Sequence, residues 1–113
     1  MTEEKEKKEL IPGSAALGMS HWQCIDLMER AEDTLESVIS SLTYLIHQER
    51  QKAQPDAALI AEWEALDDVV FNLDHSGLLD ADVETYQRVI STYQQRNKEL
   101  NEVVNRYMAA AKD

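Results

Sequence analysis

The chain has little of what breaks helices or cross-links segments. Of its 113 residues, three are glycine, two are proline and one, Cys24, is cysteine. Few glycines and prolines leave few places for the tight turns of a β-sheet. A single cysteine excludes an intramolecular disulfide and a multi-cysteine zinc site. Cys24 is therefore expected to be a small buried hydrophobe rather than a nucleophile.

Positive charge and long apolar runs are also scarce. Eleven Lys and Arg residues stand against 22 Asp and Glu residues, which gives a formal net charge of −11. Such an excess argues against binding to nucleic acid phosphates or anionic lipid, and it favours a basic protein partner or a cation. No apolar run approaches the ~18 residues of a membrane span, and residues 1–9 contain no apolar signal-peptide core. These observations predict a cytoplasmic protein with no membrane association.

Helix-forming sequence, in contrast, is abundant. Three segments repeat apolar residues every three or four positions, as a helix with one buried face requires. They run from Ser20 to about Lys52, from Pro55 to Asp74, and from Asp80 to the end of the sequence. The first stripe comprises Cys24, Met28, Ala31, Leu35, Val38, Leu42 and Leu45, and the third comprises Val83, Tyr86, Ile90, Tyr93, Asn97, Leu100, Val104 and Tyr107.

Local signals mark the boundaries of these helices. Ser20 and Gln23 fit a capping box at the start of the first helix. Gly77 is predicted to end the second helix in the left-handed conformation, and Asp80 to cap the third. We therefore predict a disordered or arm-like segment over residues 1–19 and a single helical domain over residues 20–113.

The predicted fold is all-α: a three-helix, antiparallel, coiled-coil-like bundle with long first and third helices. With short connections, the third helix would start level with Asp33 and extend past the turn between the first two. Unless a helix breaks near Ser40–Ser41 or Asn97, this stagger leaves apolar ends uncovered, and we expect a homodimer to cover them. Asn97 would then help to set the register, or lie at a wet part of the helix. The predicted apolar partner-binding residues are Trp22, Ile25, Met28, Val104, Tyr107 and Met108.

The acidic residues are concentrated in one part of the sequence. Residues 53–87 hold nine Asp and Glu residues and no Lys or Arg. Such a cluster is typical of a solvated face with helix caps, or of a surface that steers a basic partner. A DNA-mimic inhibitor is a special case of the second interpretation. The predicted acidic partner-binding residues are Glu62, Glu64, Asp67, Asp68 and Asp74.

Two possible metal-binding sites are less well supported by the sequence than a protein-binding surface. Glu29-x-x-Glu32 and Glu64-x-x-Asp67 match the acidic pairs of magnesium-dependent helical nucleotide pyrophosphatases, but the hairpin register separates them by about 16 Å. The segment from Asn72 to Gly77 resembles half of a calcium loop, but Val83 occupies the position of its bidentate acid.

Together these patterns predict a small acidic, non-enzymatic protein-binding module of the regulator, inhibitor or chaperone type. It would act through helix–helix packing and an acidic face. No catalytic residue, cofactor or metal site is predicted, and the expected partner is a protein, with a second copy of the chain completing the bundle.

Overall fold

The computed structural model describes residues 9–111. Within this range the chain forms three α-helices, one π-helical turn and no strand. The helices are α2 (His21–Arg50), α3 (Ala57–Asn72) and α4 (Val83–Ala111), and the π-helical turn η1 (Leu73–Gly77) continues α3. The predicted all-α bundle is confirmed. Of the disordered or arm-like segment predicted over residues 1–19, residues 1–8 lie outside the described range.

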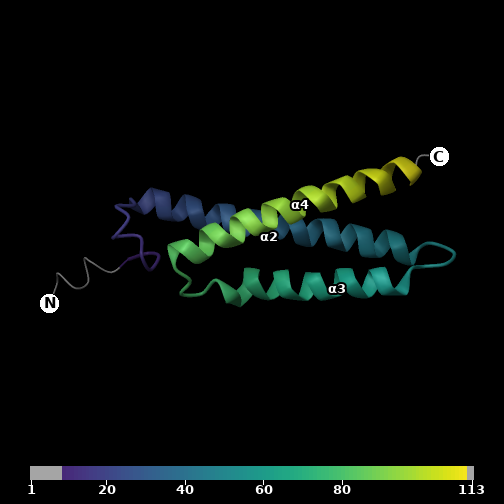
Figure 1. Cartoon of the computed structure of the whole chain (residues 1–113), viewed down its shortest axis with the longest axis horizontal. Coiled ribbons are helices and arrows are strands. Elements are labelled where there is room, and N and C mark those ends of the chain that lie inside the picture. Colours follow the sequence, from purple (N-terminus) through teal and green to yellow (C-terminus); the bar gives the residue numbers. More distant parts are fainter. Residues whose placement is uncertain (1–8, 112–113) are drawn as a thin grey trace.

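Helix α2 is the central element, because both other helices pack against it. Figure 1 shows α3 antiparallel to α2, and α4 crossing α2 in the parallel sense so that its C-terminal end diverges from α3. The most deeply buried α2 residues are Ala31, Leu35, Val38, Leu42 and Leu45. No helix within residues 9–111 is both long and apolar enough to cross a membrane.

Two polar pairs fix the register between α2 and α4. The Ser37 hydroxyl donates to the Asn97 side-chain carbonyl at 3.1 Å, and the Ser41 hydroxyl donates to that of Asn101 at 3.4 Å. Both pairs join residues 60 apart in sequence, and such a constant separation is what two helices that run in the same direction require. The alternative in which a helix breaks near Ser40–Ser41 or Asn97 does not hold, since both helices are continuous there.

Short polar side chains cap the starts of the helices, although not always at the residues that the sequence predicts. The capping box is confirmed: the Ser20 hydroxyl accepts from the Gln23 backbone N–H, and the Gln23 side chain accepts from that of Ser20. Gly77 is not left-handed; Asp80 takes that conformation instead, with φ 61°. Asp82, rather than Asp80, caps α4 by accepting the Thr85 backbone N–H at 2.8 Å.

The predicted stagger of the helices is also wrong. η1 and the following turn carry the chain further along α2 before α4 begins, so that Gln87 of α4 lies beside Asp26 and Arg30 of α2. Helix α4 therefore covers α2 along most of its length. Cys24, near one end, is 2% exposed, and Leu100, towards the other, is 5% exposed. The argument for a homodimer built on bare helix ends is removed, and homodimerisation itself stays a prediction.

The segment before α2 closes the end of the bundle where α2 and α4 begin. Ile11 is buried in the core, and the Pro12 carbonyl accepts the Val83 backbone N–H at 3.0 Å. This bond satisfies one of the free N–H groups at the start of α4. Gly13 and Gly18 have positive φ, which permits the turns between Ile11 and Ser20. These residues thus form part of the folded unit.

Candidate protein-binding surfaces

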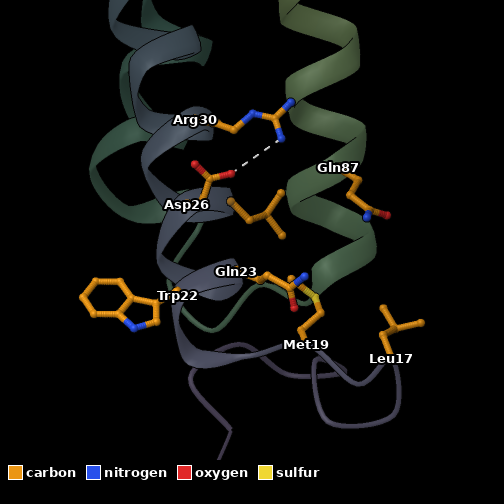
Figure 2. Close-up of a pocket in the computed structure, with 8 residues that line it drawn as sticks. Leu17, Met19, Trp22, Gln23, Asp26, Arg30 and Gln87 are labelled. Atoms are coloured by element: carbon orange, nitrogen blue, oxygen red, sulfur yellow. Dashed lines mark ion pairs between the residues drawn. The ribbon is translucent and has the colours of Figure 1, made fainter.

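A groove of about 580 Å³ lies where α2 and α4 begin. Figure 2 shows Met19 and Gln23 between the two helices, with Gln87 on the α4 side. Asp26 and Arg30 form an ion pair of 3.8 Å on the α2 side. The groove thus joins an apolar floor to hydrogen-bonding and charged walls, which is the character of a polypeptide-binding surface.

Trp22 is the most exposed large apolar residue of the described chain. It lies in the first turn of α2, is 77% exposed, and extends away from α4 (Figure 2). Its ring lies edge-on to that of His21, at 6.4 Å between ring centroids. Leu17 and Leu79 are also exposed near this end of the bundle. An exposed Trp among smaller apolar residues is typical of a protein–protein contact.

The other predicted apolar anchors are less accessible. Ile25 and Met28 are half-buried, and Met28 packs against the core. At the far end Val104 and Tyr107 are half-buried, and Met108 alone is exposed. The six residues therefore do not form one surface, because α4 covers the parts of α2 that were expected to be bare.

A buried carboxylate organises the far end instead. Glu49 is 2% exposed, and its carboxylate accepts from the Tyr107 hydroxyl, from Lys52 at 2.9 Å and from the Asp56 backbone N–H at 2.9 Å. These bonds, that of Tyr107 foremost, lower the pKa of Glu49 from 4.5 to about 2. Lys52 also lies over the Tyr107 ring, whose other neighbour is Trp63, at 6.1 Å between centroids. This cluster ties all three helices together, so Tyr107 has a structural role.

The acidic residues of α3 share one side of the molecule with those of α2. Glu64 pairs with Arg50 across a groove between the two helices that Asp67, Asp68 and His47 also line. Towards the start of α2, a second hollow is lined only by Glu29, Glu32, Asp33 and Glu36. These four residues all belong to α2. They lie outside residues 53–87, so the acidic region predicted from the sequence did not include them. Glu62, by contrast, is simply exposed.

Asp67 is the least favourably placed of these acids. Its Oδ1 atom is buried and has no hydrogen-bond partner within the described residues. Burial raises the pKa of Asp67, and the charges of Asp68 and Glu64 raise it further. Asp67 thus disfavours folding at neutral pH rather than supporting it.

Asp74 is part of η1, and most of its side chain is withdrawn from solvent. It lines a cavity of about 180 Å³ together with Glu32, His75 and Tyr86. The Asp74 side chain is 9% exposed. It is therefore not part of the open acidic surface, and only a small group can reach it.

The structure does not assemble either of the metal sites considered from the sequence. Glu29 and Glu32 lie in a different hollow from Glu64 and Asp67. In η1 the Ser76 hydroxyl donates to the Asn72 carbonyl at 3.2 Å, so this segment forms a helical turn and not an open loop. Within residues 9–111, no three His, Cys, Asp or Glu residues are grouped to hold a metal ion.

No family model, curated protein or solved structure matches the chain. Two features escaped the sequence reasoning: the burial of Glu49 and the exposure of Leu79. Glu49 continues the buried stripe of α2, four residues after Leu45, but a charged residue there is normally expected to face solvent.

Proposed function

We propose that the protein is a non-enzymatic binding module that takes up a protein partner at the end of the bundle where α2 begins. The observation that carries the proposal is the exposure of Trp22 beside the groove between α2 and α4. Trp residues are enriched at protein interfaces and contribute a large share of the binding energy of many of them.

The acidic side of α2 and α3 supports a partner with basic character. Seven carboxylates line the two open hollows on this side, and Arg50, which pairs with Glu64, is the one described Lys or Arg among their lining residues. The negative electrostatic field of these carboxylates speeds association with a positively charged partner and orients that partner. Buried apolar contacts then supply most of the affinity. A cytoplasmic location, expected from the sequence, belongs to the same proposal.

The test is a comparison of partners captured by three forms of the full chain: wild type, Trp22→Ser and Val69→Ser. Val69 is an exposed apolar residue on α3 and serves as the matched control. We expect a partner that is retained by wild type and Val69→Ser but lost with Trp22→Ser, while all three forms show the same helical content. Equal capture by all three forms would contradict the proposal.

A DNA-mimic inhibitor is the alternative form of this proposal. The carboxylates of α2 and α3 support it only in that they share one side of the molecule. If the captured partner is a DNA-binding protein, duplex DNA should displace it in a salt-dependent manner. Capture that DNA does not affect argues for a helix-binding regulator instead.

A further inference from the structure

The cavity of about 180 Å³ is lined by the carboxylate of Asp74, whose side chain is 9% exposed. Asp74 accepts no side-chain hydrogen bond from any described residue, and its ion-pair contact among these residues is with Nδ1 of His75, 3.9 Å away. The His75 Nδ1 atom lies closer to the Phe71 backbone carbonyl, at 3.0 Å, and is engaged there. Burying a charged group without such bonds is costly.

The electrostatic surroundings of Asp74 are negative. Asp74 follows the last turn of α3, and the carbonyl end of a helix repels a carboxylate. Glu32 of α2 lines the same cavity and brings a second negative charge. Together with burial, that charge raises the pKa of Tyr86, the aromatic wall of the cavity. A cationic group is therefore the occupant that complements the charge of this cavity.

The remaining walls have the character of a side-chain pocket. Met28, Leu78 and Leu79 supply apolar surface, and Leu79, at 73% exposed, stands at the rim. The Tyr86 hydroxyl donates to the Leu78 carbonyl, so the ring is held in place. A basic side chain fits this arrangement, because its aliphatic stem packs on apolar walls while its head group reaches a buried acid.

We propose that the cavity between Glu32, Asp74 and Tyr86 receives a basic side chain, through its guanidinium or ammonium group, from a protein partner. The biological source of that side chain rests on the proposed protein-binding function. The cavity itself does not, because a small cation with the same head group can test it alone. Failure of this inference would therefore leave the role of Trp22 intact.

The test is an NMR titration of the ¹⁵N-labelled full chain with N-acetylargininamide and with N-acetyllysinamide. N-acetylcitrullinamide, which has the shape of the arginine derivative without its charge, is the control ligand. We expect saturable shifts of the backbone amides of Glu32, Ser76 and Leu79 with a cationic ligand, and none with citrulline. The ratio of the two cationic affinities identifies the preferred head group.

Asp74→Asn should weaken the binding by about tenfold or more, because a charge-assisted bond is lost. Asp33→Asn, which removes the same charge from an exposed neighbouring position on α2, should change it by less than about twofold. Because asparagine has the size and shape of aspartate, the Asp74→Asn variant is expected to keep the fold, which its helical content checks. Glu32→Gln, on the opposite wall, provides a second variant with an intermediate loss.

Three results would overturn the inference. The first is equal binding of the citrulline derivative. The second is equal affinity in the Asp74→Asn and Asp33→Asn variants. The third is a pattern of small, unsaturated shifts spread over all acidic positions, which would mean that the cations only screen the surface charge.

Discussion

Two carboxylates of this chain are buried to different degrees and have opposite consequences for stability. Glu49 accepts three hydrogen bonds and is held ionised, whereas Asp67 has a buried oxygen without a partner among the described residues. Residue type alone does not distinguish them, because both are acids on helices. What differs is the set of donors that the neighbouring elements bring, so the two acids predict opposite responses to pH.

Asp67→Asn should stabilise the protein at pH 7. The raised pKa of Asp67 means that the folded state binds its proton more tightly than the unfolded state, so the penalty grows as pH rises through that pKa. We expect a gain of up to about 1 kcal/mol in urea unfolding at pH 7, limited by solvent screening, and little gain at pH 3. Asp68→Asn, at a neighbouring position on α3, is the control. A loss of stability at pH 7 in Asp67→Asn would contradict this account.

Glu49→Gln should destabilise the protein and flatten the acid limb of its stability profile. Because the folded pKa of Glu49 is about 2 against an ordinary value of 4.5, its contribution is present above pH 4.5 and is lost as pH falls towards 2. Thermal unfolding of both proteins between pH 2 and pH 7 measures this. Tyr107→Phe, which removes only one donor, should cost about 1 kcal/mol. Parallel profiles for wild type and Glu49→Gln would show that Glu49 is not held ionised by the fold.

At the scale of elements, the sequence predicts the helices well and the connection before α4 poorly. The three apolar stripes and the Ser20–Gln23 capping box are directly readable, because both depend on residues close in sequence. The course of residues 73–82 is not readable, since it depends on η1 and on the contact between Val83 and Pro12. That connection sets where α4 begins, and so decides which predicted apolar residues are buried. Trp22 and Asp74 could both be singled out from the sequence. The burial of the Asp74 side chain could not, because it depends on how η1 packs against α2.

The same connection yields a prediction at Asp80. A left-handed residue with a side chain is strained, by roughly 1–2 kcal/mol for most residue types and less for Asp, whereas glycine is not. Asp80→Gly should therefore be neutral or stabilise the protein by up to about 1 kcal/mol, and Asp80→Val should destabilise it. Thermal unfolding at neutral pH compares the two. A lower melting temperature for glycine than for valine would argue against the left-handed conformation.

The register between α2 and α4 can be tested by a double-mutant cycle. Ser37→Ala and Asn97→Ala each remove one side of a half-buried hydrogen bond, and their coupling energy should be about 0.5–1 kcal/mol. The equivalent cycle at Ser41 and Asn101, which is longer and more exposed, should give a smaller value. Equal coupling in the two cycles, or none in the first, would contradict the assignment of Asn97 as the register contact.

At the scale of the whole molecule, charge and apolar exposure are distributed unevenly. The acids gather on the side formed by α2 and α3, and the most exposed apolar residues lie where α2 begins. The end at Glu49 is closed by internal bonds instead. The end at Glu49 therefore contributes mainly to stability, and we propose that the end at Trp22 binds the partner. This arrangement also means that a homodimer, if it forms, should use the Trp22 end, which sedimentation of wild type and Trp22→Ser would reveal.

The most direct test of the binding account is site-specific photo-crosslinking in the native host. A photoreactive amino acid at position 22 should give a discrete adduct with a partner protein, whereas the same group at position 105, exposed near the end of α4, should not. The adduct at position 22 should include basic residues of the partner near the crosslinked site. The absence of an adduct at position 22, or the same adducts from both positions, would contradict the central claim that this end of the bundle binds a protein.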